Sequence, residues 1–230
     1  FVKASQSALY LNRKTSDGNI AEFRKDGTTV GSIGVSPDGA SFGNATQHIA
    51  MHSNVLFPSS NAHSYLDATI DLGTSSGRFK NLYLSGGVYL GGTGSANHLD
   101  DYEEGTFTPV VYGTTSNGTG TYTHQRGSYV KIGNLVNVQI HLGWSAHTGT
   151  GDMRVSGLPF NTENYLTYGY SGPNIHYASG LTFTRTQVGG YLAGSSDILV
   201  FNQFDSGVVS GVPMDSAVPE LIITATYRST

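Results

Sequence analysis

The segment Leu135-Val-Asn-Val-Gln-Ile-His-Leu-Gly-Trp-Ser-Ala146 decides the fold class of this chain. Its apolar and polar side chains alternate, so successive residues fall on opposite faces of an extended strand. The apolar face comprises Val136, Val138, Ile140, Leu142 and Trp144. The alternation predicts a half-buried antiparallel strand, with Trp144 in the core rather than exposed as a platform for a sugar.

Shorter runs of similar character follow this segment. Residues 181–186 repeat the alternation, whereas residues 197–204 are apolar on both faces and are predicted to form a central strand. Residues 220–228 alternate again, and a hairpin turn is expected at or near residues 125–128. No stretch shows sustained helical periodicity, because Gly, Pro, Asn-Gly or Asp-Gly interrupts every candidate. From residue 98 onward, about eight strands in roughly 130 residues predict a β-sandwich of jelly-roll type.

The composition excludes several classes of protein. The chain has 230 residues with 31 Gly, no Cys, 12% charged residues and a formal net charge of −4. Without thiols it forms neither disulfides nor a zinc–thiolate site, and we expect no cofactor. No cluster of Lys and Arg supports binding to nucleic acid, and no apolar run approaches the ~20 residues of a membrane span. Residues 1–10 lack the plan of a signal peptide, and the start at Phe1 favours a processed or truncated chain.

Turn signals divide the chain near residue 96 into two predicted domains. Residues 1–95 contain brief runs beside Asp-Gly pairs, which suit tight hairpins because both central positions take positive φ. The pairs are Asp17-Gly18, Asp26-Gly27 and Asp38-Gly39, and the runs are residues 8–11, 19–24 and 29–35. Residues 96–230 contain the longer strands. We therefore expect an all-β chain, with a shaft of short hairpins followed by an antiparallel β-sandwich tip.

Phe79, Leu82 and Leu84 are large apolar residues in a second turn-dense zone, residues 71–87, where few other apolar groups are near in sequence. Short strands bury little surface by themselves, and stacked repetitive units bury such groups between neighbours. We predict that these three residues lie in the interface of an intertwined, trimeric shaft. The alternative is a loosely folded linker.

Three motifs carry a resemblance to a known family. They are Leu99-Asp-Asp-Tyr-Glu-Glu-Gly-Thr-Phe-Thr-Pro109, Gly127-Ser-Tyr-Val-Lys-Ile-Gly-Asn-Leu-Val136 and Val155-Ser-Gly-Leu-Pro-Phe160. In this order they resemble the C-terminal domain of many bacteriophage tail fibres and related virion appendages. Residues 71–84 are similar to segments that often precede fibre tips, and residues 19–34 resemble fibre shaft.

The resemblance implies a bacteriophage tail-fibre protein of the virion. It implies a homotrimer whose distal β domain binds a host-surface glycan or other receptor, with other tail or baseplate proteins as partners. Neither nucleic acid nor membrane insertion is expected. The alternatives are a purely structural appendage (a head fibre, whisker or decoration protein), a glycan-cleaving tailspike and a secreted bacterial lectin or adhesin.

Tyrosines crowd residues 161–179, a segment rich in Gly, Asn and Ser without clean alternation. Tyrosine offers rigid amphipathic contact area and small polar residues supply hydrogen bonds, as in recognition loops. The candidate receptor-binding residues are Tyr165, Tyr168, Tyr170, Asn174 and Tyr177. The alternative is that these tyrosines pack at the rim of the sandwich or between chains.

Two further clusters are weaker candidates for metal sites. Residues 100–104 hold four acids but lack the spacing of a calcium loop, so a solvated junction or a contact to Arg78 or Lys80 of another chain is the favoured interpretation. His48 and His52 share one face if their segment is a strand, and on a trimer axis six imidazoles would surround one ion. The favoured interpretation is that both are ordinary surface histidines, with no metal.

No pattern of catalytic residues is recognisable. The acids of the predicted tip outside residues 100–104 border turn residues, and none stands in a glycosidase-like setting. The Gly-x-Ser-x-Gly elbow of serine hydrolases does not occur. We therefore expect a binding protein and not an enzyme.

Overall fold

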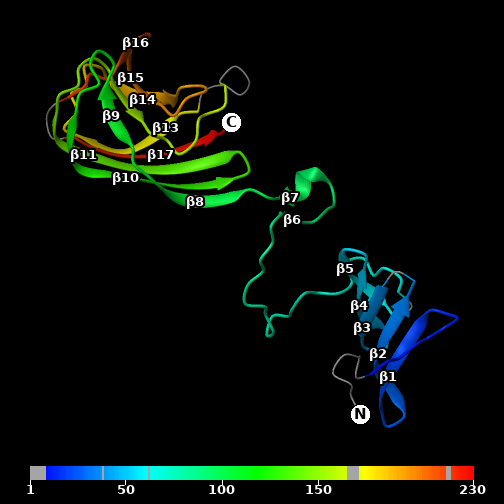
Figure 1. Cartoon of the computed structure of the whole chain (residues 1–230). Coiled ribbons are helices and arrows are strands. Elements are labelled where there is room, and N and C mark those ends of the chain that lie inside the picture. Colours follow the sequence, from blue (N-terminus) through cyan, green and yellow to red (C-terminus); the bar gives the residue numbers. More distant parts are fainter. Residues whose placement is uncertain (1–8, 38, 62, 165–170, 216–218) are drawn as a thin grey trace. The chain divides into compact units, whose positions relative to one another are not determined.

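The computed structural model describes residues 9–37, 39–61, 63–164, 171–215 and 219–230. The chain is nearly all β and its sheets are antiparallel, which confirms the all-β prediction (Figure 1). Within the described residues, no helix is long and apolar enough to cross a membrane. Contacts within the chain define two compact units, Phe1–Tyr83 and Leu84–Thr230. The predicted domain boundary, between residues 95 and 96, falls inside the second unit.

The first unit contains a five-stranded sheet in which each strand pairs with the next one along the chain. Its strands are β1 (Gly18–Lys25), β2 (Thr28–Ser36), β3 (Gly39–Gly43), β4 (Gln47–His52) and β5 (Val55–Ser60). Asp26 and Gly27 join β1 to β2 with φ of 50° and 80°, so this pair forms the tight turn that the sequence predicts.

Other expectations for the first unit were wrong. Leu9–Leu11 lies in no strand, and Asp17-Gly18 stands at the start of β1, whose first residue is Gly18, instead of joining two strands. The turn between β4 and β5, where Ser53 takes a φ of 53°, was not predicted, since it has no Asp-Gly pair. Residues 8 and 38 lie outside the described part of the chain. Asn and Ser adopt positive φ less often than Gly, so a turn built on them gives a weaker sequence signal.

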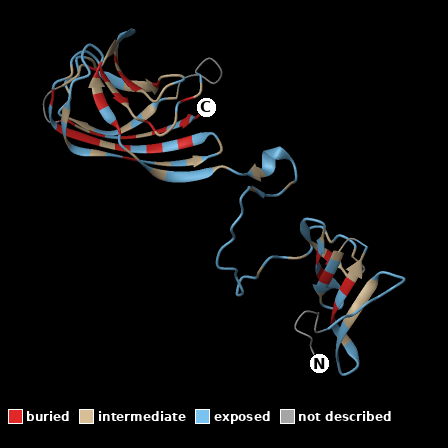
Figure 2. Cartoon of the chain, viewed as in Figure 1, coloured by how far each residue is buried: buried red, intermediate tan, exposed pale blue. Residues whose placement is uncertain are grey.

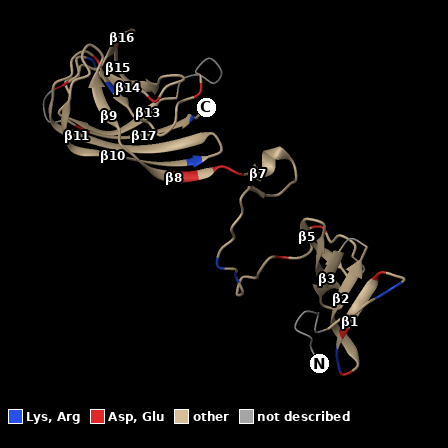
Figure 3. Cartoon of the chain, viewed as in Figure 1, with Lys and Arg blue, Asp and Glu red and all other residues tan. Residues whose placement is uncertain are grey.

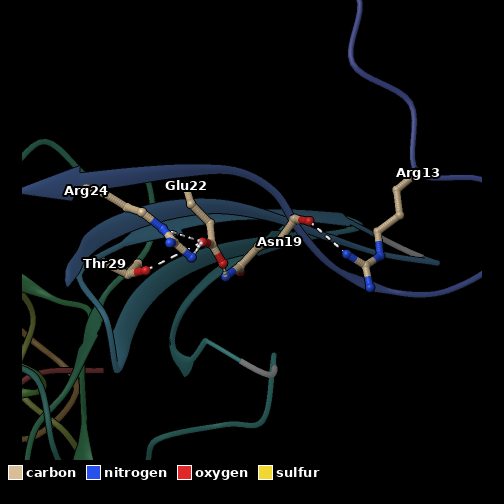
Figure 4. Close-up of polar contacts among 5 residues, drawn as sticks. All are labelled: Arg13, Asn19, Glu22, Arg24 and Thr29. Carbon is tan, nitrogen blue, oxygen red and sulfur yellow. Dashed lines mark hydrogen bonds and ion pairs between the residues drawn. The ribbon is translucent and has the colours of Figure 1, made fainter. Parts of the chain in front are cut away.

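The first strand of this sheet carries an ion pair between Glu22 and Arg24 (Figure 4). Glu22 pairs with Arg24 at 2.9 Å and accepts hydrogen bonds from Asn19 and Thr29. The hydrogen bond from Arg24 is the main cause that lowers the pKa of the Glu22 carboxyl below its usual value. Because β1 lies at the edge of the sheet, these charges discourage another strand from adding there.

The second unit contains a sandwich of two antiparallel sheets, as the sequence predicts. One sheet has the order β13-β17-β11-β10-β8, and the other has the order β14-β15-β12-β9 with β16 also paired to β15. The first sheet comprises β8 (Tyr102–Phe107), β10 (Gly120–Ile132), β11 (Leu135–His147), β13 (Pro173–Ser179) and β17 (Glu220–Arg228). The second comprises β9 (Val110–Gly113), β12 (Met153–Ser156), β14 (Gln187–Leu192), β15 (Leu199–Asp205) and β16 (Val208–Gly211). A short pair, β6 (Val88–Tyr89) and β7 (His98–Leu99), flanks the 3-10 helix Ser95–Asn97.

The core lies between these two sheets and follows the alternation of β11 (Figure 2). Trp144 is completely buried, and its ring N–H donates a hydrogen bond to the Asp215 carbonyl at 3.1 Å. The expectation that Trp144 belongs to the core is therefore confirmed. The central position predicted for residues 197–204 is also correct, because β15 lies between β14 and β12.

Two predicted features of the sandwich were wrong. The turn expected near residues 125–128 lies at Gly133, because β10 runs without interruption to Ile132. Gly127 instead leaves room for the ring of Phe107, because a Cβ added at Gly127 would lie 2.4 Å from that ring. Residues 181–186 form no strand, since the amides of Thr182 and Thr184 donate to the side chains of Asp215 and Gln203 and not to a neighbouring strand.

The buried phenol of Tyr227 makes the free energy of unfolding depend on pH in the alkaline range. Its hydroxyl donates to the Phe160 carbonyl at 3.0 Å, and burial raises the pKa of Tyr227 from its usual value near 10 to about 12. Since the raised pKa belongs to the folded state, this contribution is complete below about pH 10 and is lost as the pH rises toward 12. We expect the stability difference between wild type and Tyr227→Phe to shrink from about pH 10 to about pH 12, measured by urea unfolding. A difference independent of pH would contradict this assignment.

Candidate functional site

The outer face of the β8-containing sheet carries the candidate site. Along each strand alternate residues fill the core, and the others point away from it. One cross-strand row on this outer face is polar in all five strands: Thr106, Ser128, Gln139, Thr224 and Asn174, each opposite the next. We call these residues the polar row. Four of them are exposed and Thr224 is half-buried, so their hydroxyl and amide groups are available to a ligand.

Two adjoining hollows lie over the polar row and share Thr106, Ser128 and Gln139 in their lining. Their volumes are about 470 and 440 Å³. The larger continues toward Glu104 and Asn137, and the other continues toward residues 126, 141, 176 and 222. Together they form what we call the outer groove. Each hollow is of the size of typical small-ligand sites, which span roughly 300–1,000 Å³.

A hydrogen-bonded chain of side chains lies beside the polar row. Arg126 Nη2 donates to His141 Nδ1 at 2.9 Å, and His141 Nε2 contacts Glu220 Oε1 at 2.7 Å. A guanidinium only donates, so Nδ1 accepts and the proton of the neutral ring is on Nε2, which donates to Glu220. His124 stacks on His141 with the ring centroids 4.3 Å apart. These contacts hold the imidazole of His141 in one orientation at the wall of the groove.

His124, His141 and Glu220 have ligating atoms within 4.8 Å of one another and merit a test as a metal site. A metal on His141 Nε2 would displace the proton that the Arg126 contact places there. Histidine ligands normally donate their second N–H to a carboxylate or carbonyl, whereas here the second nitrogen accepts from a cation. The arrangement therefore favours a hydrogen-bond relay over a metal centre.

A bulge in β13 brings two consecutive side chains to the outer face. The register between β13 and β17 shifts between Ile175 and Tyr177, which leaves His176 as the extra residue. Ile175 packs against the core, while His176 and Tyr177 are both exposed. His176 Nε2 lies 2.8 Å from Thr224 Oγ1 and lines the groove.

The candidate receptor-binding residues thus fall into two groups. Asn174 belongs to the polar row, and Tyr177 lies opposite Ile222 in the neighbouring row of the same face. Tyr165, Tyr168 and Tyr170 lie outside the described residues. Four members of the polar row were not predicted as site residues: Thr106, Ser128, Gln139 and Thr224. The sequence did indicate that Gln139 lies on the polar face of the strand that begins at Leu135. It did not indicate which strands lie beside that one.

The candidate interface residues are exposed within the single chain. Phe79 is 66% exposed, Leu82 65% and Leu84 54%, and none lies in a strand. Phe79 and Leu82 belong to the first unit and Leu84 begins the second. Their burial between chains stays a prediction.

The acids of residues 100–104 lie in β8 and the segment just before it, which are red in Figure 3. They have separate partners in the same chain. Asp101 pairs with Lys131, and Asp100 lies 3.3 Å from His98 Nδ1. Glu103 accepts from the Tyr129 hydroxyl, a hydrogen bond that raises the pKa of Tyr129. Asp101 therefore has a cationic partner within its own chain, and the acids contact separate groups. A contact of this segment to Arg78 or Lys80 of another chain stays a prediction.

His48 is buried, so its interpretation as a surface histidine was wrong. Its Nδ1 lies 2.8 Å from Ser41 Oγ, and its Nε2 lies 3.0 Å from the Asn44 carbonyl and 3.1 Å from Ser32 Oγ. A carbonyl only accepts, so Nε2 carries the proton and Nδ1 accepts from Ser41. His52, at the end of β4, is half-buried. Metal binding at His48 would have to break one of these hydrogen bonds.

Comparisons with known proteins give little further information. No family model and no curated protein match the chain. Among solved structures, the Dettilon tailspike protein is similar over 56% of this chain, with 17% identity and a TM-score of 0.46. The chain matches 24% of that protein's length. A likeness this weak carries no argument, so the functional proposal depends on the residues of the outer groove and on the motifs in the sequence.

Proposed function

We propose that this chain is a bacteriophage tail-fibre protein, located in the virion, that acts as a homotrimer and attaches the particle to its host bacterium. The outer groove of the sandwich binds a surface glycan. The observation that carries the proposal is the polar row, in which all five strands of one sheet present hydroxyl or amide side chains on one face. Four of these residues line the outer groove: Thr106, Ser128, Gln139 and Thr224.

The chemistry of the groove suits a saccharide. Hydroxyl and amide groups both donate and accept hydrogen bonds, as sugar hydroxyls do. Ile222 and the His176 ring also line the groove and offer apolar area to the C–H faces of a sugar. The hollows are open, which suits a chain of sugars more than a small enclosed ligand. Binding to one groove is weak, and three identical grooves on one fibre increase the avidity.

The motifs behind the family resemblance contribute to this groove. The motif at residues 99–109 includes β8 and Thr106, and the motif at residues 127–136 includes Ser128 and the turn into β11. Two members of the polar row therefore come from segments that resemble tail-fibre tips. This coincidence supports a binding role for the face.

The test is adsorption of the full chain to a panel of bacterial cells and to a glycan array. We expect the double change Gln139→Ala and Thr224→Ala to weaken binding about tenfold or more, since each lost hydrogen bond contributes about 1 kcal/mol. Gln187→Ala is the matched control, because Gln187 is an exposed glutamine on the other sheet. Equal loss in both variants would contradict the groove assignment.

Two outcomes would favour the rival functions. Wild-type protein that binds no permissive host and does not block infection would indicate a structural appendage. Host polysaccharide that becomes shorter during incubation with the protein would indicate a glycan-cleaving spike.

A further inference from the structure

The five-stranded sheet of the first unit has an exposed apolar face. One cross-strand row on it runs Ala21, Ile33, Phe42, Ile49 and Pro58, each opposite the next. Phe23 is in phase with this row on β1, and Met51 lies opposite Leu56 beside it. We use the term apolar face for the surface formed by six large side chains: Phe23, Ile33, Phe42, Ile49, Met51 and Leu56.

These side chains expose a large continuous area. Their exposed fractions run from 37% for Ile33 to 66% for Leu56. At about 200 Å² for a fully exposed side chain of this size, they present roughly 600 Å² of apolar surface. A stable interface buries about 800 Å² on each partner, so the apolar face alone supplies most of one.

The opposite face of the same sheet is buried but polar. It carries Ser32, Ser41, His48 and Ser59, all at most 3% exposed. Among the described residues of the first unit, Ala50 is the one buried hydrophobic side chain. The burial is thus the reverse of the usual arrangement, because the polar side chains are enclosed and the apolar ones face outward. Such a unit gains little hydrophobic stabilisation until the apolar face is covered.

The composition of the apolar face fits a second copy of itself. Its six members carry no charge, so identical faces meet without like-charge repulsion. The charged pair of Glu22 and Arg24 disfavours association by strand addition at the β1 edge of the sheet. Around a threefold axis, three copies would enclose these side chains in one shared apolar interior.

We infer that the apolar face of β1–β5 is the contact through which copies of this chain associate. The inference rests on the homotrimer of the proposed function and adds a surface separate from Phe79, Leu82 and Leu84. The partner is the same face of other copies.

Adjacent residues of β5 provide a matched test. Leu56 lies on the apolar face and Val55 on the opposite one, and they are 66% and 53% exposed. In sedimentation equilibrium of the full chain, we expect wild type and Val55→Lys to have three times the 24.3 kDa chain mass. Leu56→Lys places a charge in the apolar interface and is expected to weaken association about 100-fold or more. Equal association of the two variants would overturn the inference.

A labelling experiment tests the same contact without placing a charge in it. The chain has no cysteine, so Phe42→Cys introduces a single thiol on the apolar face. We expect this thiol to react at least about tenfold more slowly with a thiol reagent in the assembled protein than after dilution to monomer. Val55→Cys is the control and is expected to react rapidly in both states.

The outcomes separate this inference from the function. A trimer whose thiol at position 42 reacts at full rate overturns the inference and leaves the homotrimer intact. Protein that is monomeric at every concentration overturns both, and a monomer whose thiol is protected shows that its own chain covers the face. Loss of adsorption in the groove variants concerns the proposed function alone.

Discussion

Replacing Trp144 with alanine is expected to lower the free energy of unfolding of the sandwich by about 3–5 kcal/mol. The side chain is completely buried between the two sheets, and the surrounding strands of a sandwich cannot close the cavity that its loss leaves. The change also leaves the Asp215 carbonyl without the hydrogen bond from the indole N–H.

Urea unfolding followed by far-UV circular dichroism measures this effect, because the variant lacks the only tryptophan fluorophore. Tyr89→Ala is the control: Tyr89 is an aromatic residue of the same unit that is 54% exposed, and its loss is expected to cost less than about 1 kcal/mol. A Trp144→Ala midpoint close to that of Tyr89→Ala would show that the core is not where we place it.

Replacing His48 with alanine is expected to destabilise the sheet of the first unit by about 2–3 kcal/mol. The imidazole is 1% exposed and links Ser41, Ser32 and the Asn44 carbonyl. Without it, these polar groups stay buried with fewer hydrogen bonds, and a cavity remains. The effect is large because this unit has few buried apolar contacts that would compensate.

Hydrogen exchange of the full chain, resolved by peptides, isolates this unit from the sandwich. We expect amides of β2–β4 to exchange about 30-fold faster or more in His48→Ala, as a change of 2–3 kcal/mol implies. Gln47→Ala, at an exposed neighbouring position, is expected to leave exchange unchanged. His48→Gln keeps a donor and an acceptor and should show an intermediate rate. Unchanged exchange in His48→Ala would mean that the buried hydrogen bonds do not hold the sheet together.

Local patterns predicted those parts of the fold that depend on near neighbours. The alternation in the Leu135 segment specifies β11 and the burial of Trp144, because side chains on a strand alternate whatever lies beside it. Asp26-Gly27 specifies a turn because both residues accept positive φ. Gly127 was misread because a glycine that admits the ring of Phe107 looks the same in sequence as a glycine in a turn.

The candidate site could be predicted only in part. Asn174 and Tyr177 were identified from composition, and both lie on the outer face of the sheet. The polar row also needs Thr106 and Thr224, which are far apart in the chain and come into one row only through the register of three strand pairs. Register depends on packing between the sheets, and no local pattern encodes it.

By itself, the sequence determined the all-β class, the sandwich after residue 98 and the core phase of β11 and β17, because these follow from turn chemistry and alternation. The tertiary structure decided which side chains share a face. It brought the polar row together across five strands, enclosed His48 among serines, and left the apolar side chains of the first unit on the outside. These arrangements arise from long-range strand pairing, in which residues distant in sequence become neighbours.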